Sequence, residues 1–134
     1  VPGRATACAT LPGAAEASGT LLPTIRAMLA EAGVALSSLD AIVFGRGPGS
    51  FTGLRTACSV AQGLGFGSGV PLLPVDTLLA VAEEARAEAG PARVVALLDA
   101  RMDEVYAARY EHDGTQWHER EGPALMRPED VEVP

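Results

Sequence analysis

The sequence predicts an α/β fold, and three observations carry that prediction. Short apolar runs at 41–44 and 72–75 alternate with stretches whose apolar residues recur at helical spacing. A glycine-rich loop follows the first of these runs and precedes a helical stretch, which gives the order strand, loop, helix. Farther along, three strand-like segments surround an Asp113-Gly114 turn, a pattern typical of an antiparallel meander. We therefore expect a first region over 1–91 and a second over 92–134.

Composition limits the classes of function. The chain has 134 residues, of which 48% are hydrophobic and 20% charged, as in a soluble globular protein. Its net charge of −7 disfavours direct binding of a nucleic-acid backbone, so we expect any nucleic acid to be met only through a basic partner. Cys8 and Cys58 have neither metal-ligand nor disulfide spacing, which favours a reducing, cytoplasmic setting. No run approaches the roughly 20 apolar residues of a membrane span.

The first region begins with a predicted strand, TACATL at 6–11. A helix follows in which Leu21 to Ala32 carry the apolar spacing. Thr20 is its expected cap, Pro23 is tolerated in its first turn, and Gly33 is its expected end.

The strand at 41–44 leads through the glycine loop to a helix that Ser50 or Thr52 can cap and that reaches about residue 63 or 66. A short buried strand is predicted at 72–75. Asp76 is expected to cap the next helix, over 77–89, which Gly90 and Pro91 end.

In the second region, strands are predicted at 93–99, 105–110 and 115–120, with Asp99 at the end of the first. The tail RPEDVEVP looks like the start of a helix.

The glycine-rich loop is the first candidate binding site. A helix that starts after such a loop presents unpaired N–H groups, which can hold an anion. The loop is no Walker motif, because Leu54 and Arg55 follow its last glycine, and no dinucleotide fingerprint, because the third glycine would fall on Ser50. Alternatively, the glycines only supply turns and close packing. The candidate anion-binding residues are Gly45, Arg46, Gly47, Gly49, Ser50 and Gly53.

Few side chains suggest catalysis. His112 and His118 flank the predicted turn and do not lie one helical turn apart, so we expect solvent-facing hairpin residues and no metal site. Asp99 could bind a metal for phosphate transfer or cap a turn. We expect Cys58 to be a small packing residue. Arg46 and Arg55 could clamp an anion, contact a partner or remain exposed.

Two stretches carry a resemblance to a known family. DAIVFGRGPGSFTGLRTACSVAQGLGFGSGVPLLPVDTLLAVA, at 40–82, looks like the signature region of the bacterial TsaB family, also called YeaZ. VVALLDARMDEVYAARYEHDGTQWHE, at 94–119, resembles the next segment of that family. The family is similar to the glycoprotease-like TsaD proteins, and the likeness covers roughly 21–128.

The resemblance implies two ribonuclease-H-like lobes of the actin-like and Hsp70-like ATPase superfamily. Residues 1–91 would be the first lobe without its initial hairpin, and 92–134 the opening strands of a truncated second lobe. It implies a non-catalytic, cytoplasmic subunit that helps a TsaD-like enzyme to make N6-threonylcarbamoyladenosine in tRNA, together with a TsaE-like ATPase. This chain alone would hold no cofactor, whereas the assembled complex could hold ATP or ADP.

The resemblance also indicates a partner surface on the first two helices, which would meet either a second copy or the TsaD-like protein. The residues carried over to this surface are Leu21, Leu22, Ile25, Met28, Leu29, Thr52, Arg55, Thr56, Ser59 and Val60. Since one helix cannot use a single apolar stripe twice, we expect the large residues to divide between core and interface.

Two other functions compete with this interpretation. The chain could bind or hydrolyse a nucleotide by itself through the glycine loop and Asp99. It could also be a peptidase, which the missing pair of helical histidines disfavours.

Overall fold

A computed structural model describes residues 5–13, 16–90 and 93–133 of the chain. The chain forms two compact units, one from the described parts of Val1–Phe44 and Phe51–Leu73, the other from those of Gly45–Ser50 and Pro74–Pro134. The helices and strands are α1 (Ala17–Ala32), η2 (Leu36–Ser38), β1 (Ile42–Gly45), α2 (Phe51–Ser68), β2 (Leu72–Val75), α3 (Thr77–Ala89), β3 (Arg93–Arg101), β4 (Glu104–His112), β5 (Trp117–Met126) and η3 (Pro128–Asp130). The domains 1–91 and 92–134 stay a prediction.

β1 and β2 form a two-stranded sheet, as their short apolar sequences predict. The Ile42 N–H donates to the Pro71 carbonyl at 2.8 Å, and the Arg46 N–H donates to the Val75 carbonyl at 3.0 Å. From the first bond to the second, the donor and the acceptor both move toward the C-terminus. The two strands therefore run in the same direction and are parallel.

The strand predicted at 6–11 is wrong. Residues 5–13 form neither helix nor strand, and residues 5–10 are all exposed. A strand needs a neighbouring strand to satisfy its backbone groups, and this segment pairs with none in the described part of the chain.

α1 begins earlier than its apolar spacing predicts, at Ala17. Thr20 is therefore inside the helix, where its hydroxyl donates to the Glu16 carbonyl at 3.0 Å instead of capping the helix. Pro23 falls in the second turn, not the first. The predicted end is confirmed: Gly33 has the left-handed φ of 64° and its N–H bonds the last turn of the helix.

α2 packs very closely against β2 at one position. A Cβ added at Gly65 would lie 2.8 Å from a Leu72 methyl carbon and 2.9 Å from Leu72 Cγ. One turn earlier, Ala61 is 3% exposed. The small residues at these two positions let the helix lie close to the strand.

This contact can be tested with two glycines of the same helix. Gly65→Ala should destabilise the chain by about 1–3 kcal/mol, because the new methyl group overlaps Leu72. Gly63→Ala should stabilise it by about 0.5–1 kcal/mol, because nothing lies within 4 Å of its added Cβ and alanine favours the helix. Urea unfolding of both variants measures the difference, and equal shifts in the same direction would contradict the close approach.

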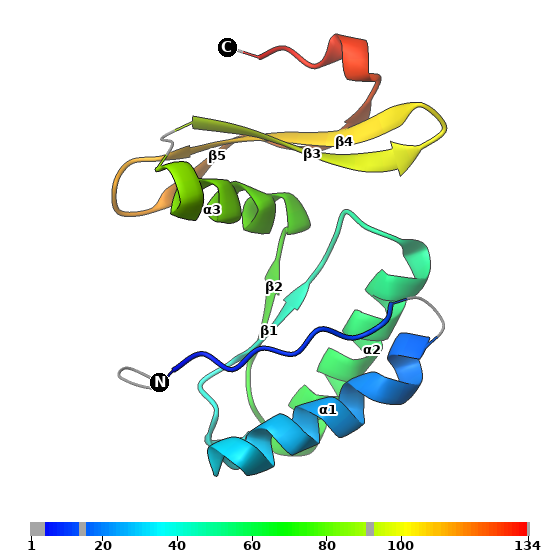
Figure 1. The fold of residues 1–134 in the computed structure, drawn as a ribbon, viewed down its shortest axis with the longest axis vertical. Coiled ribbons are helices and arrows are strands. Elements are labelled where there is room, and N and C mark those ends of the chain that lie inside the picture. Colours follow the sequence, from blue (N-terminus) through cyan, green and yellow to red (C-terminus); the bar gives the residue numbers. More distant parts are fainter. Residues whose placement is uncertain (1–4, 14–15, 91–92, 134) are drawn as a thin grey trace. The chain divides into compact units, whose positions relative to one another are not determined.

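The second unit packs α3 against a three-stranded antiparallel sheet of order β3-β4-β5, as the sequence predicts for these three strands. Figure 1 shows α3 lying along this sheet. In the register of the sheet, Arg93 faces Glu111 and His112 faces Trp117. The core between helix and sheet is built from Leu78, Ala82, Ala96, Ala108 and Tyr110.

A polar contact also joins α3 to the sheet. The Trp117 indole N–H donates to Glu83 at 2.8 Å, and Glu83 pairs with Arg86 one turn along the helix at 2.7 Å. The hydrogen bonds from Arg86 and then Trp117 lower the pKa of Glu83 to about 2. Glu83 therefore stays ionised, and keeps accepting from both donors, down to a lower pH than an ordinary glutamate.

Several strand boundaries in the second unit differ from those predicted. β3 continues past Asp99 to Arg101, and β5 continues to Met126. The tail forms one 3-10 turn, Pro128–Asp130, in place of a helix start, because the backbone is extended again at Val131. Gly90 ends α3 with a φ of 66°, as predicted, while Pro91 is outside the described residues.

Candidate functional site

The glycine loop is bound to the start of α3 through backbone groups. Gly47 is buried with a φ of 105°, a conformation that favours glycine. Its carbonyl accepts the Thr77 N–H, the first of α3, at 2.9 Å. The loop thus satisfies one of the N–H groups that a helix start leaves unpaired.

A bidentate ion pair strengthens the same junction. Arg46 Nε donates to Asp76 Oδ1 at 2.6 Å, and Arg46 Nη2 donates to Asp76 Oδ2 at 3.1 Å. The hydrogen bond and charge of Asp76 raise the pKa of Arg46. Asp76 holds the N-cap position of α3, as predicted, but its side chain makes no capping hydrogen bond. Its carboxylate is directed to Arg46 instead.

These contacts make the guanidinium of Arg46 less available to an anion. An incoming phosphate would have to compete with Asp76 for the guanidinium of Arg46. Gly45, Arg46, Gly47, Gly49 and Ser50 belong to the second unit, whereas Gly53 lies within α2 in the first. The anion-binding function of these residues stays a prediction.

Asp99 lies next to the turn between β3 and β4. Its Oδ1 accepts the Arg101 N–H at 2.8 Å. Arg101, Met102 and Asp103 all have positive φ, between 54° and 67°. This backbone conformation costs free energy for residues other than glycine. The carboxylate thus supports a strained turn, one of the two functions considered for it.

The outer side of α2 is the second candidate site. Its exposed residues recur every three or four positions from Phe51 to Phe66 and so share one face. Phe51 is 68% exposed and Phe66 is 98% exposed. The guanidinium of Arg55 stacks on the Phe51 ring, 3.8 Å from its centroid. We call this stripe the α2 outer face; it consists of Phe51, Thr52, Arg55, Ser59, Gln62 and Phe66.

The residues predicted to meet a partner divide between exposed and half-buried positions. Leu22, Thr52, Arg55 and Ser59 are exposed. Leu21, Ile25, Met28, Leu29, Thr56 and Val60 are half-buried. α1 and α2 contact each other, and Figure 1 shows them side by side. Their large apolar side chains are therefore partly used inside the first unit.

Sequence reasoning missed both phenylalanines of the α2 outer face. The signal was present, because Phe51 and Phe66 are separated by about four helical turns and share a face with Arg55 and Ser59. Helical spacing alone could not reveal whether that face points inward or outward.

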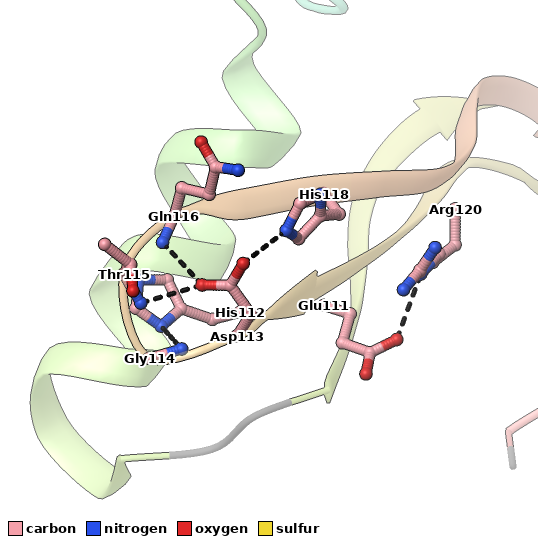
Figure 2. Close-up of polar contacts among 8 residues, drawn as sticks. All are labelled: Glu111, His112, Asp113, Gly114, Thr115, Gln116, His118 and Arg120. Carbon is pink, nitrogen blue, oxygen red and sulfur yellow. Dashed lines mark hydrogen bonds and ion pairs between the residues drawn. The ribbon is translucent and has the colours of Figure 1, made fainter.

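The two histidines flank the turn between β4 and β5, as predicted, but both are half-buried and not solvent-facing (Figure 2). Asp113 Oδ1 accepts the N–H groups of Thr115 and Gln116 at 2.8 and 2.9 Å, and its Oδ2 lies 2.6 Å from His118 Nε2. His112 Nδ1 accepts the Gly114 N–H at 3.1 Å. In the described part of the chain, no three His, Cys, Asp or Glu side chains are grouped to hold a metal.

Asp113 makes the stability of this turn depend on pH. The bond to His118, then those to the Gln116 and Thr115 N–H groups, lower the pKa of Asp113. A carboxyl with a lowered folded pKa stabilises the fold above its unfolded pKa, and that stabilisation is lost as pH falls toward the folded value. Asp113→Asn, which keeps the side-chain oxygen, should therefore destabilise the chain at pH 7 and by a smaller amount at pH 3, where the unfolded carboxyl is mostly protonated while the folded one is still ionised.

Urea unfolding of the Asp113→Asn variant and the parent chain at both pH values measures this effect. An equal difference at the two pH values would contradict the ionic contribution of Asp113.

No helix among residues 5–13, 16–90 and 93–133 has both the length and the apolarity to cross a membrane. Cys58 is half-buried within α2, in keeping with a packing function.

Comparison with known proteins identifies the family. Residues 13–134 match the model of the family described as TsaD, tRNA N6-adenosine threonylcarbamoyltransferase. The chain belongs to this TsaD-like family, among its TsaB (YeaZ) members. It is 42% identical over 117 residues to the tRNA threonylcarbamoyladenosine biosynthesis protein TsaB of Escherichia coli K12, an alignment that covers 87% of this chain and 51% of that protein.

Comparisons with further TsaB and YeaZ proteins give the same family. The chain is 49% identical over 86 residues to TsaB of Haemophilus influenzae, which covers 64% of this chain and 36% of that protein. The structure titled YeaZ from Pseudomonas aeruginosa matches with a TM-score of 0.81 at 49% identity, over 87% of this chain and 55% of that one. The chain thus spans about half the length, or less, of these TsaB and YeaZ relatives.

Proposed function

We propose that this chain is a non-catalytic, cytoplasmic accessory subunit in the biosynthesis of N6-threonylcarbamoyladenosine in tRNA, and that it binds a TsaD-like enzyme. Its relatives are named as proteins of that biosynthesis, and its family model is that of the transferase itself. The proposal includes the finer fold assignment, ribonuclease-H-like lobes of the actin-like and Hsp70-like superfamily.

The observation that carries this proposal is the α2 outer face. Phe66, at 98% exposure, is in contact with water over nearly its whole surface. Burying such a side chain against a partner contributes about 1.5–3 kcal/mol. Two phenylalanines and a stacked arginine on one helix face have the composition that protein interfaces favour.

The small residues around this face suit a helical partner. The predicted interface residues Ser59 and Thr52 are exposed and short, so a second helix can approach α2 closely between the two phenylalanines. Leu22 of α1, 41% exposed, adds apolar surface to the same unit. The same surface would form the homodimer when no TsaD-like protein is present.

The net charge and two side chains engaged within the chain support the proposed non-catalytic function. With a net charge of −7, the chain would meet tRNA through the complex and not by itself. The transfer would take place on the TsaD-like partner, and ATP or ADP would be held in the complex that also contains a TsaE-like ATPase. Arg46 and Asp99, on which independent nucleotide binding depends, are both engaged in contacts within this chain.

Ser59→Arg tests the partner surface. The long charged side chain would hold a partner helix away from α2, so we expect the complex with a TsaD-like protein to weaken at least tenfold, a loss of about 1.4 kcal/mol or more. Size-exclusion chromatography with light scattering measures complex formation, and mass spectrometry of tRNA nucleosides measures the modification.

The matched control is Ser37→Arg, which places the same side chain at an exposed position in η2 of the same unit. It should leave the complex unchanged. If Ser59→Arg binds as tightly as the control, or the unaltered chain forms no complex, the proposed surface is wrong.

A further inference from the structure

The hydroxyl of Tyr110, on β4, is buried and has no hydrogen-bond partner among the residues that the structure describes. The residue is 2% exposed and belongs to the core cluster of the second unit. A buried hydroxyl without a partner costs free energy, because it has given up its bonds to water. A phenylalanine would fill the same space without that cost. The packing of the core therefore does not account for the hydroxyl.

The ring of Tyr110 is held in place by its neighbours. It lies edge-on to Trp117, with the ring centroids 6.3 Å apart and the ring planes at 80°. The same core cluster contains Leu78 of α3, which is fully buried. Neighbours packed in this way leave the ring little freedom to turn its hydroxyl toward water. A partner for the hydroxyl must therefore move to it.

Asp76 lies where such a partner is needed. It holds the N-cap position of α3, two residues before Leu78. Burial, and then the charges of Asp76 and Glu119, raise the pKa of Tyr110 to about 12, so the field of both carboxylates reaches the phenol. The side chain of Asp76 is only 12% exposed, whereas Glu119 is exposed. The start of α3 thus brings a nearly buried carboxylate close to the buried hydroxyl.

The ion pair with Arg46 occupies this carboxylate. Both oxygens of Asp76 accept from the guanidinium, and neither caps the N–H groups of α3. The side chain of Arg46 is 56% exposed, so water competes for its donors and the pair can open. A nearly buried carboxylate that loses its cation needs another donor.

We propose that Tyr110 is the second partner of Asp76 in a two-position latch between the glycine loop and α3. In the first position Arg46 holds Asp76, and the hydroxyl is unpaired. In the second position Arg46 is released, the carboxylate turns inward, and the Tyr110 hydroxyl donates to it. The backbone bond from Thr77 to Gly47 then remains between the loop and the helix. The hydroxyl thus lets the loop release its arginine without leaving a nearly buried carboxylate unpaired.

A double-mutant cycle tests the latch. In the unaltered chain, Tyr110→Phe removes an unpaired hydroxyl, so the equilibrium constant for folding should stay the same or rise. Arg46→Met removes the guanidinium, so Asp76 should take its second position. In that background Tyr110→Phe should lower the folding constant about tenfold, because it removes a hydrogen bond to a charged group. Adding Asp76→Ala to Arg46→Met should abolish this loss.

Tyr106→Phe is the matched control, because Tyr106 is a half-buried tyrosine of the same strand that packs against the same cluster. It should have equal effects with and without Arg46. Urea unfolding followed by circular dichroism measures the folding constants, and Arg46→Ala provides the same comparison if Arg46→Met does not fold.

Equal effects of Tyr110→Phe in the two backgrounds would overturn the proposal. So would a tenfold loss from Tyr110→Phe in the unaltered chain, because the hydroxyl would then already be bonded there. The latch residues all belong to the second unit, so neither result bears on the α2 outer face, which is tested separately with the TsaD-like protein.

Discussion

The close approach of α2 to β2 is the constraint on which the first unit and the proposed partner surface depend. Gly65 leaves no room for even a methyl group beside Leu72. Leu54, Val60 and Leu64 of the same helix are half-buried, whereas Phe51 and Phe66 stay in solvent. The two exposed aromatic rings are therefore available to a partner.

In the second unit, part of the glycine loop makes contacts within the chain. The loop meets the N-terminus of α3 through the Gly47 carbonyl and the Arg46–Asp76 ion pair. The guanidinium of Arg46, which could bind a phosphate, is bonded to Asp76. These internal bonds are compatible with the proposed accessory function.

Local chemistry made much of the fold predictable, and non-local contacts account for what was missed. Gly33 and Gly90 end helices because a helix end needs a positive φ, which glycine adopts without help from distant residues. Gly114 allows the turn after Asp113 for the same reason. The strand at 6–11 was wrong because a strand depends on a partner that sequence does not specify. The Asp76 carboxylate bonds Arg46, 30 residues away, and helical spacing could not show that Phe66 faces water.

Hydrogen exchange of the chain with and without a TsaD-like protein tests the central claim most directly, because it locates the contact without altering any residue. The account predicts that complex formation slows exchange in the helical segments 17–32 and 51–68, while β3, β4 and β5 exchange as before. Slowed exchange confined to the three-stranded sheet, with α1 and α2 unchanged in the complex, would contradict it.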